Sequence, residues 1–243
     1  MMKLYTNAKP ISDLSVQVAY QTHGKAGGVV TVNFEEPREY MDVCAELAAI
    51  RFLLIEAAVC GVSAKGSGFK LIVSRSAIRK IAIKDDLSFA GAHTFAGFLR
   101  TRLSGCKIET AKKRIPEVEM FDRAEQAEPT DESPYIIQNY VIDAKPIPFE
   151  PIDTTVGTLL ISKHAIDQYL LRNDNGGNIV RPWDSISKQL RHPELRETKI
   201  PDEVMRHKIQ KYQGMTPPKV LNHPLSNLYY VVVDGVIVTT FTK

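Results

Sequence analysis

Two stretches near the start of the chain alternate between apolar and polar residues. Residues 15–22 and 29–34 both show this period of two, which is typical of half-buried strands. A glycine-rich turn at residues 23–28 joins them, so we predict an antiparallel hairpin. Residues 3–7 form a further β-prone run, and the chain is therefore expected to open with three strands.

The period then changes from two to that of a helix. Apolar residues recur at helical spacing over residues 39–59, and residues 70–74 form a continuous apolar run, as in a strand buried on both faces. The remaining expected elements are helices at 76–83 and 92–103, a strand at 107–111 and a closing helix at 117–127. The predicted order is three strands, helix, strand, helix, strand, helix.

The last third of the chain predicts a small α+β domain. Ser162 is placed to cap a helix at residues 163–172. Asp234-Gly235 separates two β-rich runs and is a strong hairpin signal. The expected elements are a strand at 158–161, helices at 163–172, 184–191 and 201–212, and hairpin strands at 228–233 and 236–241.

The net charge of +3 is unevenly distributed and suggests a domain boundary. Residues 1–123 carry a net charge of +5 and residues 158–243 carry +4, whereas residues 124–157 carry −6 and contain five prolines. Proline interrupts helices and strand ladders, so the acidic stretch is typical of a connector. We predict a domain at 1–127, a connector at 128–157 and a second domain at 158–243.

Cysteines and histidines give no sign of a metal centre in the sequence. Cys44, Cys60 and Cys106 are an odd number without CxxC spacing, which argues against a disulfide framework and a zinc site. His192 and His223, each followed by proline, lack ligand spacing, and we assign them no role. No apolar run reaches the roughly 18 residues of a membrane helix, and no signal sequence is visible. We therefore expect a cytoplasmic protein with no membrane partner.

The order of elements in the first domain resembles that of the ribonuclease H-like fold, and four motifs fall where that family has its site residues. They are Tyr5-Thr6-Asn7-Ala8, Glu46-Leu47-Ala48-Ala49, Leu71-Ile72-Val73 followed by Ser74, and Pro116-Glu117-Val118-Glu119-Met120-Phe121-Asp122. The resemblance implies an α/β ribonuclease H-like mixed-sheet domain, followed here by the small α+β domain.

Enzymes of that family use four carboxylates to hold two Mg²⁺ ions that cleave a phosphodiester. The matching positions here are Asn7, Glu46, Ser74 and Asp122. Asn7 and Ser74 carry no charge, whereas Mg²⁺ requires hard anionic oxygen ligands. The resemblance thus implies a degenerate site, and we expect no metal, no cofactor and no two-metal nuclease activity. Two interpretations of Glu46 stay open: a relict metal ligand, or a solvated or helix-capping carboxylate.

Loss of the metal site would leave nucleic-acid binding intact, because lysine and arginine supply most of the affinity for phosphate. Basic residues follow the fourth strand and precede the closing helix. The candidates for contact with RNA or DNA are Arg75, Arg79, Lys80, Lys112, Lys113 and Arg114. The alternative is that they form an ordinary solvated surface.

A second, shorter resemblance concerns the last third of the chain. Ser162-Lys163-His164-Ala165 opens a helix, Arg172 follows, and a hairpin closes the chain. This pattern is similar to RelE-like ribonuclease toxins, which cleave RNA without metal. The resemblance implies His164, Arg172 and His207 as catalytic candidates. A packing role for His164 and a solvated position for His207 are the alternatives.

Three functions are consistent with these patterns, and the sequence leaves open whether the chain is an enzyme. The first is a nucleic-acid-binding pseudonuclease without a classical two-metal site. The second is a metal-independent, toxin-like ribonuclease acting through the second domain. The third is a phage or mobile-element inhibitor or adaptor that binds a protein partner.

Overall fold

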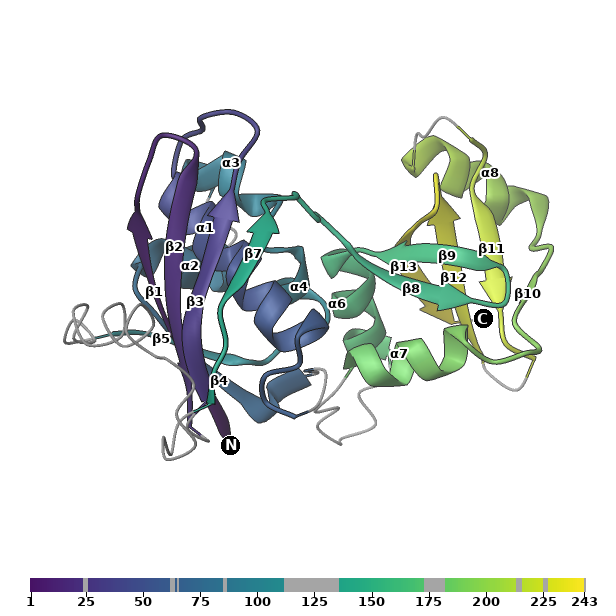
Figure 1. The fold of residues 1–243 in the computed structure, drawn as a ribbon. Coiled ribbons are helices and arrows are strands. Elements are labelled where there is room, and N and C mark those ends of the chain that lie inside the picture. Colours follow the sequence, from purple (N-terminus) through teal and green to yellow (C-terminus); the bar gives the residue numbers. More distant parts are fainter. Residues whose placement is uncertain are drawn as a thin grey trace. The chain divides into compact units, whose positions relative to one another are not determined.

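The chain folds into two compact units, Met1–Pro148 and Phe149–Lys243 (Figure 1). The computed structural model describes residues 1–23, 26–61, 64, 66–84, 87–111, 136–172, 182–212, 216–224 and 227–242. Each unit contains helices and a mixed sheet, so the predicted α/β class is confirmed. Lys112, Lys113, Arg114, Asp122 and the expected helix at 117–127 lie outside the described residues.

The first unit is built on a mixed sheet with the strand order β5-β4-β1-β2-β3, to which β6 and β7 add beside β3. β1, β2 and β3 are antiparallel, whereas β4 and β5 run parallel to β1 on its other side. The bounds are β1 Met2–Pro10, β2 Ser15–Thr22, β3 Ala26–Asn33, β4 Phe69–Val73, β5 Lys107–Thr110, β6 Ile136–Ile137 and β7 Tyr140–Asp143.

Short helices accompany this sheet. The helix α1 (Met41–Arg51) packs against β1, β2 and β3 and continues as a π-helical turn, Phe52–Glu56. α2 (Ser76–Lys84) follows β4 and packs against β5, as the apolar spacing predicts. The helix expected at 92–103 is wrong, because the chain forms two single-turn helices there instead, α3 (Ala90–His93) and α4 (Gly97–Arg100).

Two backbone segments lie very close together where the expected helix is interrupted. A Cβ atom added at Gly97 would lie 2.1 Å from the carbonyl oxygen of Pro148 and 2.7 Å from that of Ile147. Only a residue without a side chain allows the segment after β7 to lie this close. The last residues of the first unit therefore lie directly against the start of α4.

The acidic stretch predicted as a connector is incorporated into both sheets where it is described. β6 and β7 pair in parallel with β3, and the unit boundary falls after Pro148 rather than at residue 128. Side chains secure this addition: Tyr20 donates its hydroxyl to the Gln138 carbonyl at 2.9 Å, and the Val29 amide donates to Asn139 Oδ1 at 2.9 Å. The stretch thus covers the β3 edge, which would otherwise be exposed.

The second unit has a mixed sheet in the order β10-β11-β12-β13-β9-β8. α6 packs against β13, and Trp183 on α7 is buried in the core. The bounds are β8 Glu150–Thr154, β9 Gly157–Ile161, α6 Lys163–Arg172, α7 Pro182–Leu190, β10 Arg196–Glu197, α8 Asp202–Lys211, β11 Lys219–Asn222, β12 Leu228–Val233 and β13 Val236–Thr242.

Local signals in the second unit are confirmed at two places. The Ala165 amide donates to Ser162 Oγ at 3.1 Å, which is the predicted helix cap. Asp234 and Gly235 both have positive φ, 48° and 78°, as a tight turn between antiparallel strands requires. The predicted C-terminal hairpin is therefore present.

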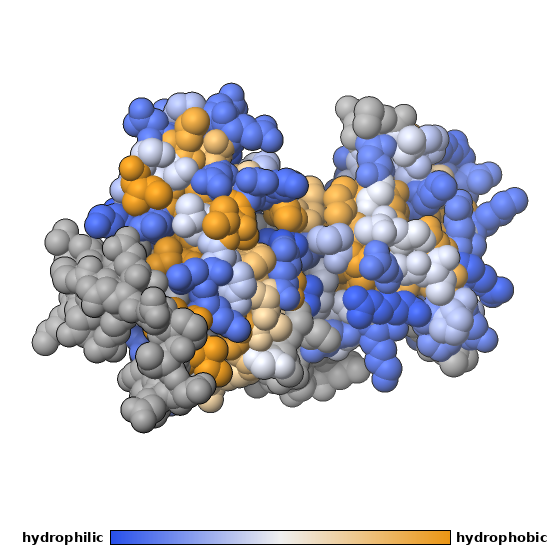
Figure 2. All heavy atoms as spheres, in the orientation of Figure 1, coloured by the Kyte–Doolittle hydropathy of each residue, from blue (hydrophilic) through white to orange (hydrophobic). Residues whose placement is uncertain are grey.

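The surface in view carries hydrophobic side chains in small groups among hydrophilic ones on both units (Figure 2). Ile136 on β6 and Val141 on β7 are two of the exposed apolar residues. Among the described helices, none has the length and apolar character needed to cross a membrane.

Candidate functional site

A fully buried carboxylate lies where β1 and β4 approach α1. Glu46, on α1, has no exposed surface. Its Oε1 accepts hydrogen bonds from Thr6 Oγ1 and from the Ser74 amide, both at 2.7 Å, and its Oε2 accepts one from Ser74 Oγ at 2.6 Å. Ser74 Oγ in turn accepts a weak bond from the Ala8 amide at 3.5 Å. The solvated interpretation of Glu46 is therefore wrong.

Two of the four positions predicted for the degenerate site, Glu46 and Ser74, are in direct contact. On β1, however, the side chain that reaches Glu46 is that of Thr6 rather than Asn7. Successive side chains of a strand point to opposite faces, so Asn7 directs its side chain away from Glu46. The fourth position, Asp122, lies outside the described residues.

The surroundings of Glu46 change its titration. Burial raises the pKa of Glu46 to about 7, although the hydrogen bonds from Ser74 and Thr6 and the charge of Arg75 oppose that rise. Asp42, one helical turn before Glu46, pairs instead with Arg75, whose Nε lies 2.8 Å from Asp42 Oδ2. Asp42 is thus paired with a cation, whereas Glu46 is held by hydrogen-bond donors.

Basic residues follow this cluster immediately in sequence. Arg75 comes directly after Ser74, with half of its side chain exposed, and Arg79 lies four residues further along the chain, on α2. Arg79 and Lys80 are both exposed on α2. The end of β4 therefore presents positive charge beside a carboxylate that is sealed from solvent.

The catalytic candidates of the second unit do not form one cluster. His164 and Arg172 are exposed and lie eight residues apart on α6, about 12 Å along the helix axis. His207 is exposed on α8. The pKa of the adjacent Lys208 is lowered, chiefly by burial, and Lys211 and Arg172 lower it further. Arg172 thus lies near α8, at the opposite end of α6 from His164.

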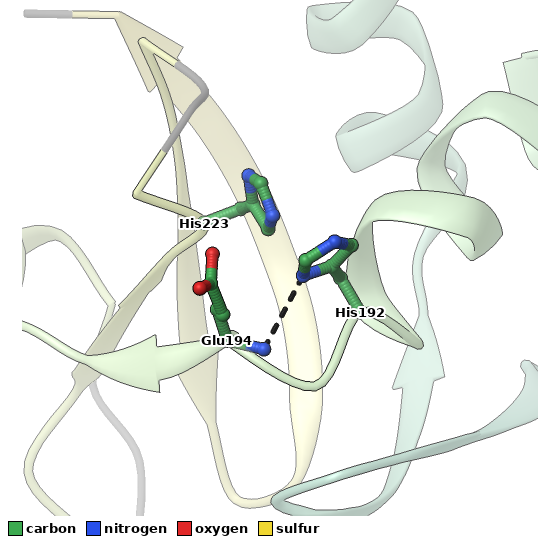
Figure 3. A group of neighbouring side chains, drawn as sticks. All are labelled: His192, Glu194 and His223. Atoms are coloured by element: carbon green, nitrogen blue, oxygen red, sulfur yellow. Dashed lines mark hydrogen bonds between the residues drawn. The ribbon is translucent and has the colours of Figure 1, made fainter.

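A different group in the second unit does converge, and the sequence analysis missed it. His192, Glu194 and His223 each offer a ligand atom, and these atoms all lie within 4.8 Å of one another. The imidazole rings meet edge to face with centroids 4.0 Å apart, and the Glu194 amide donates to His192 Nδ1 at 3.3 Å (Figure 3). The only sequence signal was the repeated His-Pro dipeptide, with Glu194 two residues after the first histidine.

Short-range backbone pairing explains why these residues meet. His192 follows α7, Glu194 precedes β10, and His223 follows β11. β10 and β11 are antiparallel, with Arg196 opposite Asn222, so the residues before one strand lie beside those after the other. Within the described part of the chain, this is the one group of three or more side chains found to be arranged for metal binding.

Comparison of the chain with protein-family models, curated proteins and solved structures found no match.

Proposed function

We propose that the first unit binds nucleic acid without cleaving it by two-metal chemistry. The observation that carries this proposal is the state of Glu46: it is buried and accepts three hydrogen bonds, and its partner Ser74 is followed in sequence by α2, which carries exposed cations. A carboxylate in this state is not available to a metal ion without breaking those bonds. The neighbouring cations can still attract phosphate.

The arrangement of the first unit is consistent with the ribonuclease H-like resemblance. Three antiparallel strands are followed by a helix, a parallel strand, a helix and another parallel strand, and together they form a mixed sheet. Glu46 and Ser74 meet at the corner where the resemblance implies a catalytic site. We infer a degenerate ribonuclease H-like domain in which serine and threonine replace the metal as partners of the carboxylate.

Arg79 and Lys80 are the described residues best placed to contact phosphate. Both are exposed, whereas Arg75 is engaged with Asp42. Replacing both residues by glutamate removes their attraction for phosphate and adds repulsion at that part of the surface. Lys188 and Arg191, at the end of α7 in the second unit, are also exposed and provide a matched change of four charges elsewhere.

The test is fluorescence anisotropy with labelled RNA, DNA and RNA–DNA hybrid of equal length at about 50 mM salt. The full chain should bind at least one probe, and Arg79→Glu/Lys80→Glu should weaken that binding at least ten-fold more than Lys188→Glu/Arg191→Glu. The bound probe should stay intact when Mg²⁺ is added. Equal effects of the two double variants would contradict the proposed interface, and Mg²⁺-dependent cleavage would contradict the pseudonuclease.

A further inference from the structure

The group of His192, Glu194 and His223 has the donor atoms of a transition-metal site. Two imidazoles and one carboxylate are a ligand set that Zn²⁺ uses when a fourth position is left for water or substrate. Hard ions such as Mg²⁺ prefer oxygen donors alone, so the two histidines favour a softer divalent ion. The three side chains approach a common space from two segments: His192 and Glu194 lie between α7 and β10, and His223 follows β11 (Figure 3).

We propose that His192, Glu194 and His223 bind one divalent transition-metal ion of the Zn²⁺ class, with a coordination position open to solvent. This site lies in the second unit and does not depend on the function proposed for the first. Ligand atoms around a tetrahedral Zn²⁺ with bonds of 2.0–2.1 Å are about 3.3 Å apart. Here they lie within 4.8 Å, so a closure of about 1.5 Å completes the site.

The structure shows which ligand can move to bring the three donor atoms closer together. His223 is buried, with 8% of its surface exposed, whereas Glu194 is exposed and its carboxylate can rotate toward the two rings. His192 Nδ1 accepts the Glu194 amide at 3.3 Å, a long hydrogen bond that coordination through this nitrogen would replace. The exposure of Glu194 also keeps one side of the ion accessible to water.

The backbone around the histidines is well supported. The His192 carbonyl accepts the Leu195 amide at 3.0 Å and Thr155 Oγ1 at 3.4 Å. Asn222 Nδ2 donates to the Leu228 carbonyl at 2.9 Å, which joins the two ends of the loop that begins with His223. Each histidine also precedes a proline, which restricts its backbone to extended conformations. The backbone at two of the three ligands is thus held before an ion binds.

The probe for this site is Zn²⁺ added to the full chain after treatment with a chelator. Isothermal titration should give one equivalent that disappears in His192→Ala and weakens at least ten-fold in Glu194→Gln. Glu194→Gln changes an exposed residue and keeps its size, so loss of folding does not confuse the result. His23→Ala and Glu203→Gln are controls at exposed positions elsewhere.

Co²⁺ provides a readout that reports on the donor atoms themselves. The wild-type chain should develop the visible absorption of Co²⁺ in a low-coordinate nitrogen–oxygen site, and His192→Ala should lose it while both controls keep it. The proposal is overturned if Zn²⁺ binds the His192 and Glu194 variants within ten-fold of the wild-type affinity. It is equally overturned if the folded wild-type chain binds no Zn²⁺ in the titration.

Discussion

Ser74 donates hydrogen bonds to both oxygens of the Glu46 carboxylate, from its amide to Oε1 at 2.7 Å and from its hydroxyl to Oε2 at 2.6 Å. Because the first of these donors is the backbone of the residue that directly follows β4, the carboxylate joins α1 to the sheet. Thr6 adds a third donor from β1. The Glu46 carboxylate therefore holds three elements of this domain together.

Replacing Ser74 by alanine should destabilise the first unit. Ser74→Ala deletes the donor to Oε2 and leaves that buried oxygen short of a partner, which typically costs about 1–3 kcal/mol. Ser76→Ala, at an exposed position two residues later, is the matched control and should change stability by less than about 0.5 kcal/mol. Hydrogen exchange of the β1 and β4 amides measures the effect, because Trp183, the single tryptophan, reports only on the second unit. Equal protection in the two variants would show that the Oε2 bond is dispensable.

The stability of the first unit should fall as pH rises toward neutrality. The pKa of Glu46 is raised to about 7 by burial, from an ordinary value of 4.5. Below about pH 4.5 both folded and unfolded chains hold the proton. Between 4.5 and 7 only the folded chain keeps it, so this contribution to stability decreases by about 3 kcal/mol in total and is then constant.

Glu46→Gln isolates that pH effect from other titrating groups. Glutamine resembles the protonated acid, and the Ser74 hydroxyl can rotate to accept its amide hydrogen. Unfolding free energies measured from pH 4 to 9 should converge for variant and wild type at acid pH and separate in favour of the variant near pH 8. A difference that does not change with pH would mean that folding does not shift the pKa of Glu46.

Replacing Gly97 by alanine should destabilise the first unit by about 1–3 kcal/mol, as overpacking does in other cores. Its added Cβ would overlap the carbonyl oxygen of Pro148 at 2.1 Å, and both partners of this contact are backbone. Gly91→Ala is the control, because a Cβ at Gly91 in α3 meets nothing within 4 Å. Chemical denaturation followed by circular dichroism compares the two. If Gly97→Ala is as stable as Gly91→Ala, the segment at Pro148 is not closely packed in solution.

Alternation and helical spacing predicted the strands β1 to β5 and the helices α1 and α2 of the first unit. The same alternation shows why Asn7 was the wrong residue to expect beside Glu46. Leu4, Thr6 and Ala8 are buried and lie on one face of β1, so Thr6 was the residue to expect opposite Glu46. The motif resemblance pointed to Asn7, one residue further, and a shift of one residue in a strand reverses the face.

The acidic charge and five prolines of residues 124–157 predicted a connector, but β7 and β8 lie within this stretch. β8 contains Pro151 and lies at the edge of its sheet, where proline is tolerated. The strand β7 (Tyr140–Asp143) is short and has acidic, proline-rich surroundings, and composition alone predicted a connector there. Local pattern alone could not predict either strand, because each forms by pairing with an edge strand: β7 with β3, and β8 with β9.

The histidine group was beyond sequence reasoning for a geometric reason. His192 and His223 are 31 residues apart and have no ligand spacing. They meet because β10, a strand of two residues, pairs with β11. A strand this short has no period to detect, so the contact becomes visible only in three dimensions.

The salt dependence of nucleic-acid binding tests the central claim most directly. Binding of the preferred probe to the full chain should weaken steadily between about 50 and 200 mM salt, since released counterions supply the affinity. Arg79→Ala/Lys80→Ala should make the slope of log K against log salt shallower by about 2, because each phosphate contact contributes about 0.9. Lys188→Ala/Arg191→Ala should leave the slope unchanged. A wild-type chain that binds no probe at the lowest salt, or a slope that the Arg79 and Lys80 substitutions do not alter, would contradict the account.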